Sequence, residues 1–195
     1  TRAIEGLPDG SFVFCSFNNS YKIGPEEFDV WMSLLRDIPE SVLWLLESNT
    51  MVADNLRAEA RARGVDSNRI VFARRLAVDE HLARQRLADL FLDSFNVHAH
   101  TTASDALWAG LPVVTLPGKQ FAARVGASLV SAAGLKQLVA KDAEDYERIA
   151  RSMAANPARL RALRRGLEAD RLTLPLFDTI SYCREFEQLL LRTQA

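Results

Sequence analysis

The sequence predicts an α/β fold in which a parallel sheet of about six strands carries helices on both faces. Short runs rich in aromatic and β-branched residues alternate with segments whose apolar residues recur at helical spacing. Glycine, proline and asparagine separate the two kinds of segment at most of the changes. Strands that alternate with helices in this way are joined by right-handed crossovers and form a parallel sheet.

The elements follow from these local signals, with Pro25 favouring a helix start and Pro39 and Gly64 favouring helix ends. The strands predicted in chain order are 12–17, 41–46, 69–72, 90–93, 112–116 and a short one at 138–140. The helices predicted in chain order are 25–38, 51–63, 78–87, 102–109, 121–133 and one that Asp142 caps. Beyond Pro157 the pattern is purely helical and ends in a helix over residues 177–192.

The composition indicates one globular domain over residues 1–195. The chain has 195 residues and a mass of 21.7 kDa, of which 48% are hydrophobic and 25% charged. The net charge of −1 provides no field that would recruit nucleic acid or an anionic membrane, so neither is an expected partner.

Cysteine content and hydropathy indicate the compartment. Cys15 and Cys183 fit neither a disulfide framework nor a zinc site, which favours a reducing environment. No apolar stretch approaches the roughly 20 residues of a membrane span, and no signal peptide is recognisable. We therefore expect a cytoplasmic protein, and a first residue Thr1 suggests a fragment of a longer one.

Ligands of open parallel sheets bind beyond the carboxyl ends of the strands. That rule directs attention to the loops after Phe17, Phe72, Asp93 and Leu116. No GxGxxG follows the first strand and no GxxxxGK[ST] occurs, which disfavours hydride transfer and P-loop chemistry.

The loop after Asp93 carries the most informative pattern. Thr101 or Thr102 is expected as the N-cap of a helix whose free N–H groups and positive dipole end suit a phosphate. Asp105, one turn further on, is placed to accept hydrogen bonds from two ribose hydroxyls. The alternative is a plain capping box between Thr102 and Asp105.

Two further groups of residues are candidates. Lys22, in the first loop, is suited to neutralise a leaving diphosphate, with a solvated surface lysine as the alternative. His81 and Arg84 lie one helical turn apart, so an imidazole can stack on a base while a guanidinium bonds its edge. Their alternative is an exposed polar face.

Two other patterns receive a structural interpretation. His98 and His100 lack the further ligands of a zinc site, so no metal is expected there. The helix near residue 160 has an apolar face, so its basic residues are expected to form a solvated face. These basic residues are Arg159, Arg161, Arg164 and Arg165, and the apolar ones are Leu160, Leu163 and Leu167.

Four segments together resemble the protein O-linked N-acetylglucosamine transferase and SPINDLY-like family. They are 17–23 (FNNSYKI), 41–46 (SVLWLL), 68–72 (NRIVF) and 100–112 (HTTASDALWAGLP), and the match covers essentially the whole chain. The resemblance implies a GT-B glycosyltransferase, in which two Rossmann-like lobes close over a nucleotide sugar. It further implies that this chain is the C-terminal lobe, which holds UDP-GlcNAc.

The resemblance also assigns roles to individual residues. Lys22 matches the family lysine at the diphosphate, Tyr21 should line the sugar pocket, and Asn19 stands where animal members have glutamine. The backbone of Leu76 matches the stretch that hydrogen-bonds uracil. The remaining matches are nucleotide contacts from His81 and Arg84, the phosphate-binding helix start at His100, Thr101 and Thr102, and the ribose carboxylate Asp105.

The sequence departs from the family pattern at two places. Val78 occupies a position where animal enzymes have a lysine, and Val97–His98 replaces Cys-Asn beside the sugar. UDP binding is expected to survive both changes, whereas the preference for N-acetylglucosamine over another hexose is what they bear on.

What the resemblance implies is the donor half of an inverting protein glycosyltransferase that places GlcNAc on Ser or Thr. No Asp-x-Asp motif is present, so metal-independent transfer with no cofactor is expected, UDP-GlcNAc being the donor substrate. The protein acceptor would bind an N-terminal lobe and tetratricopeptide repeats that this chain lacks. A UDP-glucose-dependent glucosyltransferase lobe and a non-catalytic nucleotide-binding or interaction module remain as alternatives.

A single lobe is expected to transfer no sugar, because a GT-B enzyme reacts in the cleft between its two lobes. The final helix presents an apolar face at helical spacing, formed by Tyr182, Phe186, Leu189 and Leu190. We expect part of this face to pack across the lobe junction, and to be exposed or self-associated when the other lobe is missing.

Overall fold

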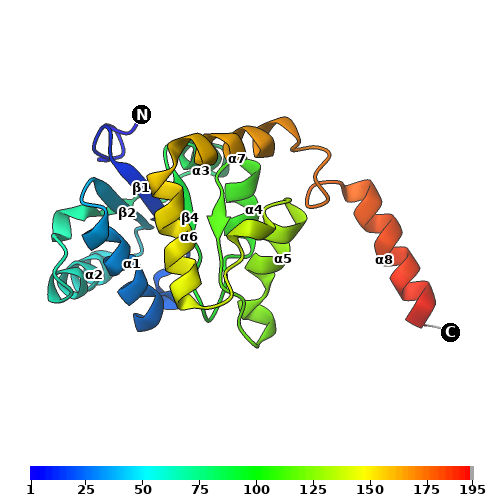
Figure 1. Cartoon of the computed structure of the whole chain (residues 1–195), viewed down its shortest axis with the longest axis horizontal. Helices are drawn as coiled ribbons and strands as arrows, with labels where there is room; N and C mark the ends of the chain where they lie inside the picture. Colours follow the sequence, from blue (N-terminus) through cyan, green and yellow to red (C-terminus); the bar gives the residue numbers. More distant parts are fainter. Residues whose placement is uncertain (194–195) are drawn as a thin grey trace.

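A five-stranded parallel sheet with the strand order β3-β2-β1-β4-β5 organises the chain in the computed structural model, which describes residues 1–193 (Figure 1). The strands are β1 (Phe12–Ser16), β2 (Ser41–Leu46), β3 (Ile70–Ala73), β4 (Leu90–Leu92) and β5 (Val113–Val114). All pairings between neighbouring strands are parallel. The predicted α/β class is therefore confirmed, with one strand fewer than expected.

The predicted sixth strand at 138–140 is reduced to a single bridge. Thr115 and Val139 pair in parallel, through backbone bonds from Thr115 to Leu138 and from Ala140 to Thr115. The strand does not extend because Lys136–Leu138 form the 3₁₀ turn η4 immediately before it.

Eight α-helices and three further 3₁₀ turns connect and cover the strands in residues 1–193. The helices are α1 (Pro25–Asp37), α2 (Thr50–Ala62), α3 (Val78–Gln85), α4 (Thr101–Trp108), α5 (Val125–Ala132), α6 (Ala143–Ala155), α7 (Pro157–Ala169) and α8 (Thr179–Thr193). The turns are η1 (Ser20–Lys22), η2 (Ser67–Arg69) and η3 (Phe121–Ala123). The single helix predicted at 121–133 is thus divided at Arg124 into η3 and α5.

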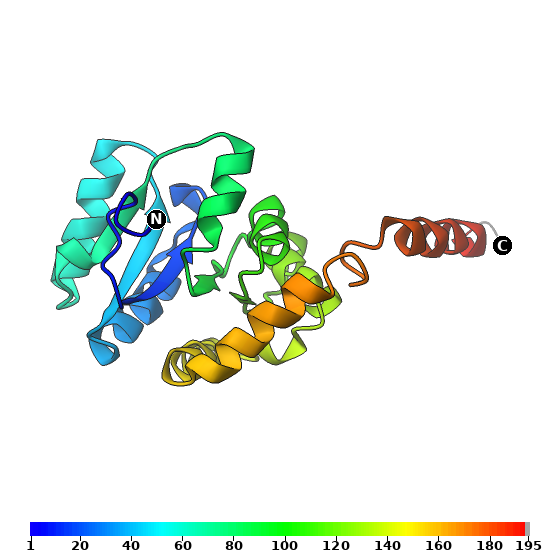
Figure 2. The same cartoon turned by 90° about the horizontal axis from the view of Figure 1, so that it is seen from above.

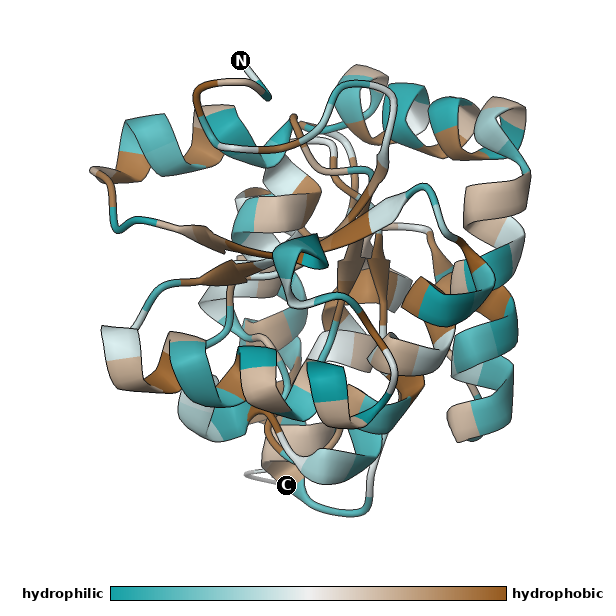
Figure 3. Cartoon of the chain, turned by 90° about the vertical axis from the view of Figure 1, so that its left-hand side faces the viewer, coloured by the Kyte–Doolittle hydropathy of each residue, from teal (hydrophilic) through white to brown (hydrophobic). Residues whose placement is uncertain are grey.

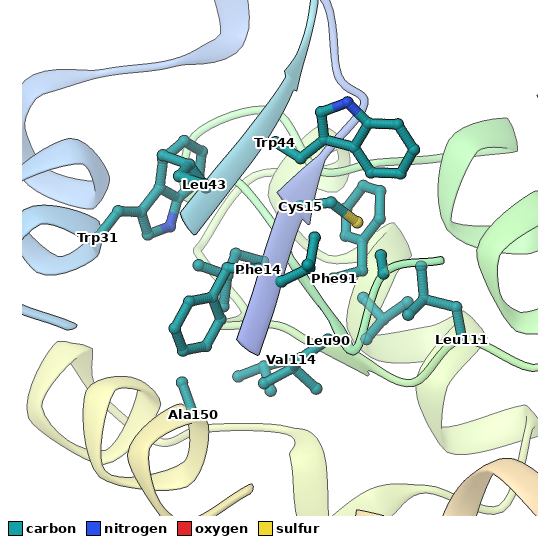
Figure 4. Close-up of a cluster of buried hydrophobic side chains, with 14 of the residues drawn as sticks. Phe14, Cys15, Trp31, Leu43, Trp44, Leu90, Phe91, Leu111, Val114 and Ala150 are labelled. Carbon is teal, nitrogen blue, oxygen red and sulfur yellow. The ribbon is translucent and has the colours of Figure 1, made fainter. Parts of the chain in front are cut away.

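The core forms because successive residues of the central strands point to opposite faces of the sheet. Phe14 lies beside Leu43 on the face where Trp31 of α1 packs, whereas Cys15 lies beside Trp44 on the other face (Figure 4). All five side chains are buried. Coloured by hydropathy, the strands form an apolar layer between helices whose outer surfaces are largely polar (Figure 3).

The crossovers reverse direction between β1 and β4, which are neighbours in the sheet. From β1 the chain proceeds through α1 towards β2, and from β4 it proceeds through α4 towards β5, on the other side. Right-handed crossovers in opposite directions place α1 and α4 on opposite faces. The loops after β1 and β4 therefore diverge and leave a crevice at the carboxyl edge of the sheet.

Helix α7 corrects one expectation. Leu160 and Leu167 are buried as predicted, but Arg164 does not belong to a solvated face. Its guanidinium donates hydrogen bonds to the carbonyl oxygens of Arg86 and Ala88, which follow α3. Because these carbonyls come from a segment about 76 residues away in the chain, periodicity alone does not reveal the contact.

Helix α8 projects away from the rest of the molecule (Figures 1 and 2). It contains no buried residue, and Tyr182 and Phe186 stack on each other with ring centroids 6.1 Å apart. The predicted exposure of its apolar face is confirmed, whereas the packing of that face on another lobe stays a prediction. None of the helices in residues 1–193 has the length and apolar character needed to cross a membrane.

Truncation tests how little α8 contributes to the fold. A chain that ends at Asp178 should unfold within about 2 °C of the full chain, because surface changes away from packed groups are nearly neutral. A chain that ends at Asp170 also loses the partly buried Leu174, Leu176 and Phe177. That loss should cost roughly 3 kcal/mol and lower the Tm by about 6–12 °C. Calorimetry in which both truncations unfold alike would contradict this division.

Candidate functional site

Asn18 ties together the two loops that border the crevice. Its side chain is buried two residues beyond the end of β1, where Nδ2 donates to the Ser94 hydroxyl at 3.0 Å. Its Oδ1 accepts a hydrogen bond from the Thr102 hydroxyl of α4 at 2.9 Å. Asn18 is not among the site residues predicted from the sequence, although it is a polar residue that immediately follows the strand predicted at 12–17, which is a usable signal. The loop after β1 and the start of α4 are thus held in register.

Lys22 lies at the end of η1, with its side chain directed at the neighbouring loop. Its Nζ donates a hydrogen bond to the carbonyl oxygen of His98 at 2.9 Å, and the residue is half-buried. An ammonium has three donors, so two remain for a ligand in the crevice. The alternative of a freely solvated surface lysine is therefore wrong.

The start of α4 differs from the expected cap. The N-cap residue is His100, whose side chain makes no capping bond, and the first backbone bond is donated by Ala103 to the His100 carbonyl at 3.1 Å. Neither Thr101 nor Thr102 is the N-cap, and the Thr102 hydroxyl bonds Asn18, so the proposed Thr102–Asp105 capping box does not form. The amides of Thr101 and Thr102 precede the first bond of the helix and point towards the crevice end.

A cavity of about 260 Å³ lies between the segment after β3 and the first turns of α3 and α4. Its lining comprises Phe17, Leu46, Arg75, Leu76, Val78, His81, Arg84, Thr102 and Asp105. Five predicted site residues therefore share this cavity, although they come from three separate segments. The others, namely Asn19, Tyr21, Lys22, His100 and Thr101, lie outside its lining.

His81 and Arg84 form a pair inside this lining. The Nε and Nη2 atoms of Arg84 donate to Nδ1 of His81 at 3.1 and 2.9 Å, so His81 carries its own hydrogen on Nε2. Burial, reinforced by the positive charge of Arg84, lowers the pKa of His81 to about 4. Its ring stands edge-on to Phe17 with centroids 5.1 Å apart. His81 is therefore a neutral ring held at a fixed angle.

Arg84 is not part of an exposed polar face, because only 5% of the residue is accessible. Its Nη1 donates to the carbonyl oxygen of Arg74, and its guanidinium lies 5.4 Å from the centre of the Phe17 ring. Most of its hydrogen-bonding capacity is thus used within the protein. The direct contacts of Arg84 hold His81 and the segment after β3 in place.

Asp105 supplies the carboxylate of the cavity. The residue is half-buried, and this burial raises its pKa. No hydrogen bond to its carboxylate is found within residues 1–193. The oxygens are therefore free to accept from a ligand with adjacent hydroxyls.

Asn19 and Tyr21 lie on the open side of the crevice. Tyr21 is 80% exposed, and its hydroxyl accepts from Nδ2 of Asn19 at 3.4 Å. Arg75 was missed by the sequence analysis, and it donates to Oδ1 of Asn19 at 3.2 Å while lining the cavity. These side chains form a polar rim that no part of residues 1–193 covers.

His98 and His100 do not converge on a common point. Nε2 of His98 bonds the Leu116 carbonyl at 2.9 Å, and Nε2 of His100 lies 3.3 Å from the Ala122 carbonyl. In residues 1–193 no group of three or more His, Cys, Asp or Glu residues is arranged to hold a metal ion.

A larger cavity, about 640 Å³, lies against α5 and is bordered by Pro117, Phe121 and Arg124. One of its lining residues, Phe121, approaches His100 of the site, at 6.5 Å between ring centroids. Arg124 is its one charged side chain, so the chemistry is concentrated in the smaller cavity.

Comparison with known proteins identifies the family. Residues 1–186 match the sequence profile of Glycosyl transferase family 41. The chain belongs to this family. The family 41 chain is 40% identical over 188 residues to a probable UDP-N-acetylglucosamine--peptide N-acetylglucosaminyltransferase, SEC, of Arabidopsis thaliana. It is also 40% identical over 190 residues to the UDP-N-acetylglucosamine--peptide N-acetylglucosaminyltransferase of Caenorhabditis elegans.

These matches cover 96% and 97% of the family 41 chain but only 19% and 16% of the two relatives. An O-GlcNAc transferase mutant of Thermobaculum terrenum superposes with a TM-score of 0.88 at 32% identity, over 94% of this chain and 36% of that one. The fold is accordingly that of one Rossmann-like GT-B lobe. Anabaena HepE, solved with UDP and glucose, shares the fold with a TM-score of 0.61 at 16% identity, over 93% of this chain and 48% of that chain.

The lowered pKa of His81 has a measurable consequence. An unfolded histidine has a pKa of about 6.5, so between pH 6.5 and 4 the unfolded chain binds a proton that folded His81 does not. The contribution of His81 to stability is therefore complete above pH 6.5 and is lost as the pH falls towards 4. In NMR titrations the His81 ring signals should stay constant from pH 7.5 to about 5.5. A midpoint near 6.5 would contradict the hydrogen bonds assigned to Nδ1.

Proposed function

We propose that residues 1–195 form the donor-binding lobe of an inverting, metal-independent glycosyltransferase that adds GlcNAc from UDP-GlcNAc to Ser or Thr of proteins. The observation that carries the proposal is the cavity at the carboxyl edge of the sheet, near the reversal of the crossovers between β1 and β4. Leu76, His81 and Asp105 converge there beside the start of α4. The named activities of the family 41 relatives agree with it.

The nucleoside would occupy this cavity. The neutral ring of His81 offers a flat apolar face for a pyrimidine, while the backbone of Leu76 offers hydrogen bonds to its edge. The carboxylate of Asp105 would accept from the two ribose hydroxyls. Arg84 would act indirectly, because its hydrogen bonds to Nδ1 of His81 hold the imidazole ring in a fixed position.

The diphosphate would lie between Lys22 and the start of α4. The free amides of Thr101 and Thr102 and the positive end of the helix dipole favour a phosphate there. His100, as the N-cap residue, would border the same group. The Lys22 ammonium would supply the full positive charge, and its two remaining N–H groups would be available to the diphosphate.

The reaction requires charge stabilisation at the leaving group. The Ser or Thr oxygen forms a bond to C1 of the sugar on the side opposite the diphosphate, and the bond from C1 to the diphosphate oxygen breaks. UDP leaves with the electron pair, and the hydroxyl proton passes to a base on the acceptor side. Lys22 faces the charge that develops on UDP, so its contribution is greatest in the transition state.

The choice of sugar depends on the rim. Asn19 has a shorter side chain than glutamine, and Tyr21 is exposed, so the N-acetyl group would be recognised differently from the pattern in animal members. UDP-glucose is therefore the second candidate donor. Competition between UDP-GlcNAc and UDP-glucose for UDP binding separates the two, and binding of neither would favour a non-catalytic module.

A protein acceptor, a cytoplasmic location and an inactive isolated lobe remain part of the proposal. Acceptor positioning would come from an N-terminal lobe and repeats, since the crevice of residues 1–193 is open on the side of Tyr21. The exposed face of α8 is proposed to contact that lobe.

Substitution of Asp105 tests the nucleoside site. Asp105→Ala should weaken uridine and UDP binding alike, by about 1–3 kcal/mol, because it removes the proposed ribose contact. Glu168→Ala, at a carboxylate that borders Gly110 at the other end of α4, is the matched control and should leave both affinities unchanged. Calorimetry that finds wild-type uridine affinity in Asp105→Ala would refute the assignment.

Substitution of Lys22 tests the catalytic role. In the complete transferase, Lys22→Met should reduce kcat by about 100-fold or more. The KM for the donor should rise far less. Steady-state kinetics measures both constants. A change confined to KM would mean that Lys22 contributes only uniform binding.

A further inference from the structure

A fully buried polar cluster lies behind Lys22. Asp93 follows β4, Thr115 follows β5, and His98 belongs to the loop that leads into α4, yet all three side chains are inaccessible to solvent. Gly126, in the first turn of α5, closes the cluster from the other side. Burial of three polar side chains without a ligand is costly unless each one is paired.

The carboxylate of Asp93 holds the end of the loop. Its Oδ1 accepts the amide of Ala99 at 2.6 Å, and its Oδ2 accepts the Thr115 hydroxyl at 2.8 Å. The Tyr146 hydroxyl donates to the backbone carbonyl of Asp93 at 2.9 Å. The amide of Ala99 is thus held by a carboxylate that Thr115 fixes in turn, while Tyr146 fixes the backbone of Asp93.

The imidazole of His98 fixes the middle of the same loop. A carbonyl oxygen only accepts, so the contact with Leu116 at 2.9 Å places the hydrogen of His98 on Nε2. Nδ1 then accepts the amide of Gly126 at 3.1 Å and lies 3.3 Å from the Thr115 hydroxyl. The backbone amide of His98 donates to the Ala122 carbonyl at 2.9 Å.

The fit of α5 against the cluster requires glycine at position 126. A Cβ there would lie 2.2 Å from Oδ2 of Asp93, 2.8 Å from Nδ1 of His98 and 2.9 Å from Oγ1 of Thr115. All three distances are shorter than a carbon atom tolerates. Glycine at position 126 therefore lets α5 approach the cluster closely, so that its amide bonds Nδ1 of His98.

With its side chain held inside, His98 presents its carbonyl oxygen to the crevice, where it accepts the hydrogen bond from Lys22 at 2.9 Å. We propose that Asp93, His98 and Thr115 are positioning residues, which place the Lys22 ammonium at the diphosphate through the carbonyl of His98. This inference rests on the function proposed above and deepens it. The family resemblance predicts His98 beside the sugar, whereas its ring is buried between Leu116 and Gly126.

The physical reason for such a cluster is the freedom of a lysine side chain. An ammonium on a four-carbon stem has many rotamers, and a rigid acceptor selects among them before a ligand arrives. The acceptor is rigid only if its peptide cannot rotate. The bonds to Ala99, Leu116 and Gly126 supply that rigidity on both sides of the carbonyl.

The test compares UDP with uridine, because the ratio of their affinities measures the contribution of the diphosphate contacts. Calorimetry on the 195-residue chain gives this ratio for the wild type, Lys22→Met and His98→Leu, and for the double variant. Thr115→Val removes the hydroxyl at constant shape and is a second, milder variant, with Thr115→Ser as its rescue. Ser41→Ala, which deletes a hydroxyl bonded to Ile38 at the opposite end of the sheet, controls for general destabilisation.

Lys22→Met should lower the preference for UDP by about tenfold. His98→Leu and Thr115→Val should lower the same ratio by roughly three- to tenfold, with uridine affinity unchanged. The double variant should be no worse than Lys22→Met alone, because both changes remove one interaction. Thr115→Ser and Ser41→Ala should keep the wild-type ratio.

Three results would overturn the inference. One is a wild-type UDP preference in folded His98→Leu and Thr115→Val, as shown by thermal unfolding, while Lys22→Met loses it. Another is an additive double variant, which would mean that the cluster acts independently of Lys22. If the wild type does not prefer UDP to uridine at all, the proposed function fails first and this inference fails with it.

Discussion

The position of the site depends on one topological constraint, the reversal of the crossovers between β1 and β4. These strands are neighbours in the sheet although about 75 residues separate them in the chain. Their loops must diverge to opposite faces, so an open crevice at the carboxyl edge is unavoidable. The side chain of Asn18, which bonds both Ser94 and Thr102, then fixes how far the two loops stand apart.

Within this crevice the protein separates two kinds of recognition. The cavity beside α3 is shaped by packing, since Arg84 is buried against Phe17 and holds a neutral His81. The region of Lys22 and the α4 start is defined by charge and by free amide groups. The proposed donor joins a neutral nucleoside to a charged diphosphate and would require these two environments side by side.

Charged side chains at the site are positioned by backbone carbonyls. Lys22 donates to the carbonyl of His98. Arg84 donates to that of Arg74 and also lies 3.9 Å from the carboxylate of Glu5. A carbonyl neutralises no charge, so the Lys22 ammonium retains its attraction for an anionic ligand while it loses rotamer freedom. An ion pair with a carboxylate would have fixed the geometry equally well but would have cancelled the charge.

The sequence by itself determined the elements that local chemistry specifies. The strand at 41–46 and the helix start at Pro25 coincide with β2 and α1, because burial pattern and proline act within a few residues. The same local reasoning found Lys22, His81 and Asp105, since each lies just beyond a strand end or on the first turns of the helix that follows. The family resemblance then assigned their roles.

Only the tertiary structure decided what depends on distant partners. The strand predicted at 138–140 is a single bridge in the structure, because η4 precedes it. The Thr102 hydroxyl does not cap α4 but bonds Asn18, 84 residues away. The sequence pattern predicts that Arg164 faces solvent, and the family resemblance predicts that His98 lies beside the sugar. In the structure Arg164 donates to a carbonyl oxygen 76 residues away, and His98 to one 18 residues away. A pattern in sequence records spacing along one element, whereas these side chains bond groups that only folding brings within about 3 Å.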